Sequence, residues 1–211
     1  MLFRSTRRAA SIGADAVLVR TPSFFKGRMT SEVFVRHYTA VADASPVPVL
    51  LYNFPAVTGV NLLPDAVARL ADHPNITGMK ESGSDMAQIA ALVDAVPPAF
   101  SIIAGSAPAL YASLCVGARG GILAVACIAP ELCLRVLEAA TQGRHADARE
   151  IQKRITPLAR LVTTAHGVPG LKAAMDVCGY VGGEPRQPLA PASAEAVNQI
   201  RAELAHVQEA V

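Results

Sequence analysis

The stretch Ile76-Thr77-Gly78-Met79-Lys80 is short, mostly apolar and ends on a lysine. Its apolar residues are nearly continuous rather than alternating with polar ones, which is typical of a strand in a parallel sheet buried on both faces. The sequence predicts five such strands, the other four being Ala16–Arg20 (AVLVR), Pro48–Asn53 (PVLLYN), Ser101–Gly105 (SIIAG) and Gly121–Ala126 (GILAVA).

Amphipathic stretches with helical periodicity separate these runs. They cover Ser31–Ala44, Pro64–Asp72, Asp85–Val96 and Ala107–Val116. Alternation of strand and helix predicts right-handed βαβ units. Beyond residue 126 only helices are expected, over Glu131–Thr141, Ala146–Ala165, Val168–Cys178 and Ser193–Ala210. We therefore expect an α/β part, residues 1–141, and a helical extension, residues 142–211, packed on it.

Periodicity leaves two arrangements of these strands open. Five strands satisfy an open doubly wound sheet, whereas they are too few to close an eight-stranded barrel. A nucleotide-binding role for an open sheet is disfavoured, because no glycine-rich phosphate-binding motif follows any predicted strand.

Composition indicates a core-rich globular protein. Of 211 residues, 52% are hydrophobic and 17% are charged, which excludes a disordered chain. The formal net charge of +2 gives no reason to expect nucleic acid as a partner. No run approaches the roughly 18 consecutive apolar residues of a membrane span, so we expect no membrane partner.

The cysteines and histidines suggest neither a metal site nor a disulfide framework. The cysteines lie in apolar or helical settings without a C-x-x-C spacing, which is typical of buried thiols in a reducing compartment. The five histidines are dispersed. We expect no metal, no cofactor and a cytoplasmic location.

The first residues, MLFRSTRRAAS, permit two interpretations. Their arginines, hydroxyl residues and lack of acids have the composition of a mitochondrial presequence. They also fit the polar face of an ordinary helix that stops at Gly13. We favour the helix, because the pattern is short and lacks a clear cleavage signal; a mitochondrial location is the alternative.

Lys80 is the first candidate for chemistry. It stands at the C-terminal end of a predicted parallel strand, where α/β folds place their active sites. Burial disfavours an ammonium ion, so a lysine there can be a neutral amine that attacks a carbonyl group. The alternative is a lysine that extends into solvent and pairs with Glu81.

Tyr52 is expected beside this lysine. It lies near the end of the preceding strand, where alternation places Leu50 and Tyr52 on one face. Alternation likewise places Ile76, Gly78 and Lys80 on one face of the next strand. Gly78 leaves room for a side chain from the neighbouring strand. A phenol beside an amine can shuttle protons during imine chemistry; the alternative is an ordinary core tyrosine.

With these motifs in place, the sequence resembles the dihydrodipicolinate synthase/N-acetylneuraminate lyase family of class I aldolases. The resemblance covers residues 5–204. Within the family, the chain looks most similar to 4-hydroxy-2-oxoglutarate aldolase. The motifs that carry the resemblance are Tyr52-Asn53-x-Pro55-x-x-Thr58-Gly59, Gly78-Met79-Lys80-Glu81, Ala104-Gly105-Ser106-Ala107, Thr21-Pro22-Ser23-Phe24-Phe25-Lys26-Gly27-Arg28-Met29, Gly167-Val168-Pro169-Gly170 and Gly179-Tyr180-x-Gly182-Gly183.

The resemblance implies a (β/α)₈ barrel with C-terminal helices, usually a homotetramer, that acts on a small 2-oxo acid. Lys80 would form a Schiff base with the keto carbon of pyruvate or another 2-oxo acid, and Tyr52 would relay the proton. Substrate-binding positions would be Thr58 and Gly59, which shape the loop after the Tyr52 strand, together with Gly105 and Leu123 at the ends of the next two strands.

Three departures from the family pattern qualify this expectation. The family's first three strands, with their carboxylate-binding loop, have no counterpart in this sequence. Phe24 stands where relatives place a relay tyrosine. Val57 stands where dihydrodipicolinate synthases carry an arginine for the second substrate's carboxylate, which argues against that activity.

Two functions follow as hypotheses. The first is a pyruvate-dependent aldolase or lyase that cleaves 4-hydroxy-2-oxoglutarate or a similar 2-oxo acid to pyruvate and an aldehyde such as glyoxylate. The second is a catalytically impaired homologue or subunit fragment with an interaction role. Because a partial barrel exposes strand edges and an apolar interior, we expect poor solubility or self-association.

Overall fold

The computed structural model describes residues 3–209, which form two compact units. The first comprises residues 3–106 and 115–121, and the second comprises residues 107–114 and 122–209. The division predicted at residue 141 stays a prediction. None of the helices in these described residues is both long and apolar enough to cross a membrane.

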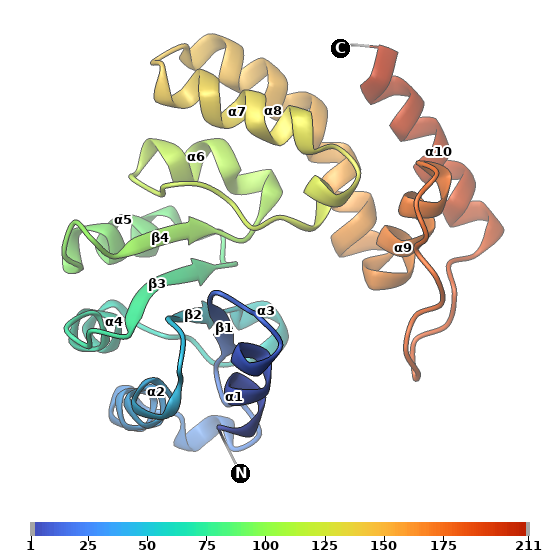
Figure 1. The fold of residues 1–211 in the computed structure, drawn as a ribbon. Helices are drawn as coiled ribbons and strands as arrows, with labels where there is room; N and C mark the ends of the chain where they lie inside the picture. The colour runs from blue at the N-terminus through green and yellow to red at the C-terminus, as the bar shows by residue number, and fades with distance from the viewer. Residues whose placement is uncertain (1–2, 210–211) are drawn as a thin grey trace. The chain divides into compact units, whose positions relative to one another are not determined.

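The first unit is built on a four-stranded parallel sheet whose strands follow one another in chain order (Figure 1). All four coincide with predicted strands, which confirms the predicted α/β class and the parallel sheet. The strands are β1 (Val17–Arg20), β2 (Val49–Asn53), β3 (Ile76–Glu81) and β4 (Ser101–Ala104).

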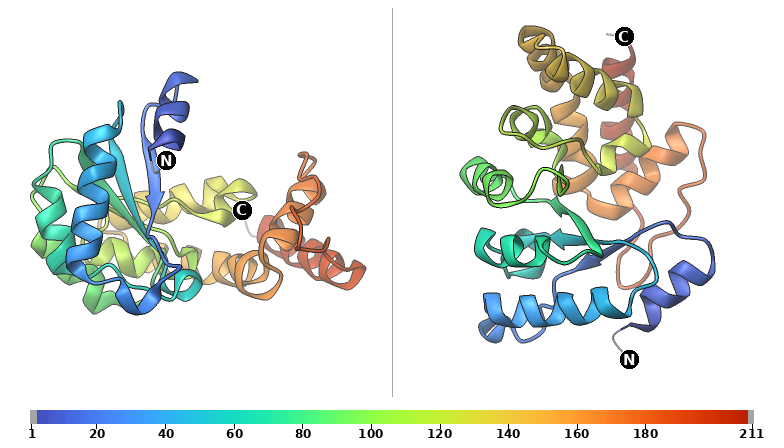
Figure 2. Two further views of the ribbon diagram at one scale, coloured as in Figure 1. Left: turned by 90° about the horizontal axis from the view of Figure 1, so that it is seen from below. Right: turned by 60° about the vertical axis from the view of Figure 1, so that its left-hand side comes forward.

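One face of this sheet is covered by α2 (Ser31–Ala44), α4 (Pro64–Ala71) and α5 (Met86–Ala95), which Figures 1 and 2 show in a row along it. Local chemistry fixes where each helix begins. The Thr30 hydroxyl caps α2, and Pro64 is the first residue of α4. The Asp85 carboxylate caps α5 by accepting hydrogen bonds from the backbone N–H groups of Ala87 and Gln88. The core between these helices and the sheet includes the fully buried Phe34, Tyr38, Leu51, Met79 and Leu92.

Two further α-helices and a 3₁₀ turn, η1 (Lys26–Arg28), belong to the first unit. The N-terminal helix α1 (Arg4–Ser11) is present, as predicted, and Gly13 follows it with a positive φ. Directly after β2, α3 (Pro55–Thr58) forms a single turn.

The second face of the sheet carries no helix of this unit. The side chains that point to it alternate with the buried ones and are partly or fully exposed, apart from Gly78. The strand register aligns them in two rows, Leu18–Leu50–Gly78–Ser101 and, one step nearer the C-terminal edge, Arg20–Tyr52–Lys80–Ile103.

The predicted fifth strand, Gly121–Ala126, is wrong. Only Gly121 pairs with the sheet, through a single bridge to Ala104, and residues 124–127 form a 3₁₀ turn. Leu123 and Val125 of this run are buried and Ile122 is exposed, but β4 ends at Ala104 and leaves Ile122 onward without a ladder partner. An apolar run alone does not make a strand, because a strand also requires a neighbour of matching length.

The second unit is helical, as predicted. The expected helix 146–165 divides in two, because a π-helical turn (Leu161–Ala165) follows α8. Its other elements are η2 (Ala107–Ala109), most of α6 (Leu110–Cys115), η3 (Ala124–Cys127), α7 (Pro130–Thr141), α8 (His145–Arg160), α9 (Gly167–Val177) and α10 (Ala194–Glu209).

Candidate active site

Lys80 and Tyr52 meet at the C-terminal edge of the sheet. They are direct register partners on β3 and β2, and both side chains are half-buried on the face without helices. The Lys80 Nζ lies 4.5 Å from the centroid of the Tyr52 ring. The alternation of side chains along the strands predicted this juxtaposition. What the pair does chemically is a separate question.

The alternative interpretation, a surface ion pair between Lys80 and Glu81, is wrong. Glu81 is only 1% exposed and lies on the opposite side of β3. Its carboxylate accepts hydrogen bonds from Asn53 Nδ2 (2.8 Å), the Gly83 backbone N–H (2.5 Å) and Gln88 Nε2 (3.3 Å). Burial raises the pKa of the Glu81 carboxyl above its ordinary value, although these donors oppose the shift.

This buried network connects the elements that position Lys80. Asn53 closes β2, and its side-chain carbonyl also accepts the Leu62 backbone N–H at 3.0 Å. Its amide donates to Asn61 Oδ1 at 2.7 Å as well as to Glu81. The ends of β2 and β3 and the loop between β2 and α4 are therefore held together beneath the lysine.

Gly105 lies directly beside the lysine. Its N–H donates to the Glu81 carbonyl at 2.6 Å. A Cβ at this position would overlap the Ser82 hydroxyl and lie 2.9 Å from Lys80 Cε. A side chain at residue 105 would therefore displace both neighbours.

Ser82 is a residue of this site that the sequence reasoning missed. Its Oγ is buried and has no hydrogen-bond partner among the described residues. A buried hydroxyl without a partner is costly, so this oxygen is available to a bound ligand. The only sequence signal was its position two residues after Lys80.

Gly78 lies between β2 and β4 and is closest to the backbone of β4. A Cβ there would lie 2.7 Å from the Ser101 backbone oxygen on β4 and 3.6 Å from Leu50 Cδ2. The glycine therefore lets β4 approach closely.

Thr58 and Gly59 shape the loop after β2. Thr58 is buried, and its hydroxyl lies within hydrogen-bonding distance of the Phe54 and Val60 carbonyls, at 3.0 and 3.1 Å. Gly59 adopts a φ of +67°, and a Cβ there would lie 2.8 Å from Lys26 Nζ. Both residues have clear backbone roles, and a direct part in substrate binding stays a prediction.

Leu123 belongs to the second unit. It is 8% exposed and has an extended backbone just before η3. Its predicted place in the substrate pocket stays a prediction.

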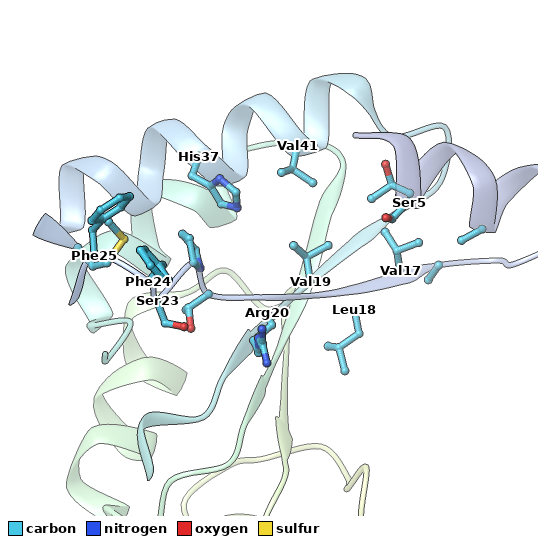
Figure 3. Close-up of a pocket in the computed structure, with 16 residues that line it drawn as sticks. Ser5, Val17, Leu18, Val19, Arg20, Ser23, Phe24, Phe25, His37 and Val41 are labelled. Carbon is cyan, nitrogen blue, oxygen red and sulfur yellow. The ribbon is translucent and has the colours of Figure 1, made fainter. Parts of the chain in front are cut away.

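A cavity of about 910 Å³ runs along β1, between α1, α2 and the loop after the strand (Figure 3). Phe24 and Phe25 are at its mouth, 89% and 67% exposed, with their rings edge to face at 5.0 Å. Figure 3 shows that Val19 points toward His37 and Val41, whereas Leu18 and Arg20 point to the opposite side of the strand.

Comparison with known proteins places these features in a family. The model of the dihydrodipicolinate synthetase family matches residues 3–207. The chain belongs to this family. The family resemblance seen in the sequence is therefore confirmed. The fold of this member of the dihydrodipicolinate synthetase family corresponds to part of the family's (β/α)₈ barrel, together with C-terminal helices.

Several relatives of this family member are known. A 4-hydroxy-tetrahydrodipicolinate synthase from an Exiguobacterium species is 36% identical over 195 residues, 92% of this chain and 66% of the relative. A probable mitochondrial 4-hydroxy-2-oxoglutarate aldolase from Emericella nidulans is 37% identical over 190 residues, 89% of this chain and 61% of the relative.

The solved structures agree. The dihydrodipicolinate synthase of Thermotoga maritima superposes with a TM-score of 0.91 at 29% identity, over 98% of this chain and 70% of that one. This member of the dihydrodipicolinate synthetase family thus spans about two thirds of the length of the curated relatives it matches.

Proposed function

We propose that this chain carries the catalytic pair of a Schiff-base aldolase that acts on 2-oxo acids. The observation that supports this proposal most directly is the position of Lys80 Nζ, 4.5 Å from the centre of the Tyr52 ring at the C-terminal edge of the parallel sheet. Family membership supports the general class of activity, that of aldolases and lyases, without naming the substrate.

In the proposed reaction, the Lys80 nitrogen attacks the C2 carbonyl, and the carbonyl oxygen leaves as water. The resulting protonated imine withdraws electrons. A base removes the proton of the C4 hydroxyl, the C3–C4 bond breaks, and its electron pair moves into the enamine while an aldehyde departs. Protonation at C3 and hydrolysis of the imine release pyruvate and regenerate the amine.

Tyr52 is the proposed acid and base in these proton transfers. Its ring lies against the lysine, with the ring centroid 4.5 Å from Nζ, and a phenol beside an imine can exchange protons with it. Ser82 has a buried Oγ with unused hydrogen-bonding capacity beside Gly105, and we assign it to the bound 2-oxo acid. Gly105 keeps this space open.

We propose 4-hydroxy-2-oxoglutarate, cleaved to pyruvate and glyoxylate, as the substrate. The Emericella relative bears the name of that aldolase. Val57, an exposed aliphatic side chain after β2, stands where the resemblance places the arginine of dihydrodipicolinate synthases. An aliphatic side chain cannot pair with a carboxylate. Dihydrodipicolinate synthesis remains the competing activity, because most of the named relatives carry that name.

A direct test is to supply 4-hydroxy-2-oxoglutarate and measure pyruvate and glyoxylate. The expected result is equimolar release of both products by the 211-residue chain and none by Lys80→Met. Lys153→Met, which changes an exposed lysine of α8, is the matched control and should retain activity. Equal rates for the two variants, or no release by the unmodified chain, would contradict the proposal.

A second candidate function is that of a non-catalytic interacting subunit. The observation that favours it is the exposed Phe24–Phe25 pair at the mouth of the cavity along β1. Co-purification with a full-length relative, together with an unreactive Lys80, would support this candidate over the aldolase.

Assembly and location complete the proposal. By family resemblance we propose a homotetramer, and from the unpaired cysteines we propose a cytoplasmic location. The mitochondrial alternative finds support in the name of the Emericella relative. Sedimentation analysis and localisation of a tagged full gene product test the two statements separately.

A further inference from the structure

Arg20 extends the row of side chains that contains the catalytic pair. It is the last residue of β1, and the register pairs it directly with Tyr52, which in turn pairs with Lys80. Figure 3 shows its side chain on the side of β1 away from Val19 and α2. This is the same helix-free face on which Tyr52 and Lys80 lie.

Arg20 has no ion-pair partner among residues 3–209. The ion pairs recorded for residues 3–209 involve Arg69, His73, Arg144 and Lys153, and none includes Arg20. The neighbours that share its sheet face carry no charge apart from Lys80; they are Leu18, Leu50, Tyr52, Gly78, Ser101 and Ile103. An exposed guanidinium without an acidic partner on this surface is available to an anionic ligand.

The spacing suits one kind of anion. Neighbouring strands lie about 4.8 Å apart, so the Cα atoms of Arg20 and Lys80, two strands apart, are separated by about 10 Å. Both side chains are long and rise from the same edge. A five-carbon 2-oxo acid joined to Lys80 through C2 can therefore extend across Tyr52 toward β1, bringing a group at C5 near Arg20.

We propose that Arg20 binds the second carboxylate of a 2-oxo dicarboxylic acid substrate and so determines its specificity. The planar guanidinium matches a carboxylate through two parallel hydrogen bonds. This inference rests on the proposed function. Arg20 supplies from β1 the positive charge that Val57, in the α3 turn after β2, does not supply.

The test compares two probes that differ only at C5. 2-Oxoglutarate ends in a carboxylate, and 2-oxopentanoate has a methyl group in its place. Each is titrated against the chain, reduced with borohydride, and the modified Lys80 peptide is quantified by mass spectrometry. The unmodified chain should reach half-maximal labelling at a concentration about 10- to 100-fold lower for 2-oxoglutarate, the range expected for hydrogen bonds to a charged group.

Arg20→Met should abolish this preference, while labelling by 2-oxopentanoate stays within about twofold of that of the unmodified chain. Arg20→Lys should show an intermediate preference, because lysine keeps the charge but lacks the planar guanidinium. Arg36→Met, which changes an exposed arginine of α2, is the control and should keep the preference. Thermal melting of each variant verifies folding.

The outcomes separate the two proposals. If the unmodified chain is labelled by both probes with equal efficiency, or if folded Arg20→Met keeps the preference for 2-oxoglutarate, the assignment of Arg20 is overturned while the aldolase proposal stands. If neither probe labels Lys80, the aldolase proposal fails and the assignment of Arg20 fails with it.

Discussion

At the level of single residues, the proposed chemistry depends on what surrounds the Lys80 side chain. The Tyr52 ring lies 4.5 Å from the nitrogen, and Gly105 lies beside Cε of the same side chain. The carboxylate next to it in the sequence belongs to a buried network beneath the sheet. The reactive and the supporting groups thus lie on opposite faces of one strand.

Replacing Tyr52 by phenylalanine separates proton transfer from imine formation. Tyr52→Phe keeps the ring that packs against Lys80 and removes only the hydroxyl. We expect kcat for cleavage to fall by about 10²- to 10⁴-fold, as for loss of a general acid–base group, with KM little changed. Steady-state kinetics checks this, and an unaltered kcat would exclude Tyr52 as the proton relay.

Glu81 predicts a pH dependence of stability. The unfolded carboxyl has a pKa near its ordinary value of 4.5, and burial raises the pKa in the folded protein. Between the two values the folded protein holds more protons, so the free energy of unfolding falls as pH rises through this window and levels off above the raised pKa.

Glu81→Gln removes this titration and provides the measurement. Urea denaturation midpoints of both proteins are compared from acidic to neutral pH. The midpoint of the unmodified chain should decline relative to that of the variant as pH rises. Parallel profiles would show that Glu81 does not titrate abnormally.

At the level of elements, the backbone just after β4 lies very close to the end of β3. Gly105→Ala introduces a methyl group into the space of Ser82 Oγ and Lys80 Cε. We expect a loss of about 1–3 kcal/mol in the free energy of unfolding, as for overpacking in a core, together with reduced cleavage. Denaturation and kinetics measure the two effects.

Gly120→Ala is the matched control for this substitution. Gly120 lies in the segment that follows β4 along the edge of the sheet, and a Cβ there has no atom within 4 Å. Its stability and activity should be close to those of the unmodified chain. Equal effects of the two substitutions would mean that crowding at Lys80 is not the cause.

Local signals in the sequence predicted most elements of the fold. Helix α2 is correct at both ends, because a threonine cap and an amphipathic repeat are local properties. The juxtaposition of Tyr52 and Lys80 followed from alternation alone, since adjacent parallel strands that end together bring their last side chains together.

What the sequence could not show depends on contacts between distant segments. The run after Gly121 looks like a strand but lacks a partner. Gly78 lies close to the backbone carbonyl of Ser101 on β4. The Ser82 hydroxyl is buried without a hydrogen-bond partner among the described residues, beside Gly105 of a different strand end. The role of Arg20 required the register of β1 against β2.

At the scale of the whole molecule, β1 is an edge of the sheet with one neighbour among the described strands. Exposed apolar side chains surround it: Ile12, Leu18, Phe24 and Phe25. An exposed edge strand beside apolar groups favours pairing with another chain. We therefore expect association that increases with protein concentration, measured by sedimentation velocity.

Two substitutions test the origin of this association. Leu18→Lys with Phe24→Ser should shift the distribution toward smaller species, because charge on an edge strand opposes pairing. Leu134→Ser, which changes an exposed leucine of α7, should have little effect. A monodisperse monomer at every concentration would contradict this interpretation of β1.

The central claim is that Lys80 forms an imine with a 2-oxo acid. The most direct measurement is reduction with borohydride in the presence of pyruvate, followed by peptide mass spectrometry of the chain. The expected result is a carboxyethyl group on Lys80, with Lys26, Lys153 and Lys172 unmodified, and no labelling when pyruvate or borohydride is omitted. An unmodified Lys80, or labelling spread evenly over all these lysines, would contradict it.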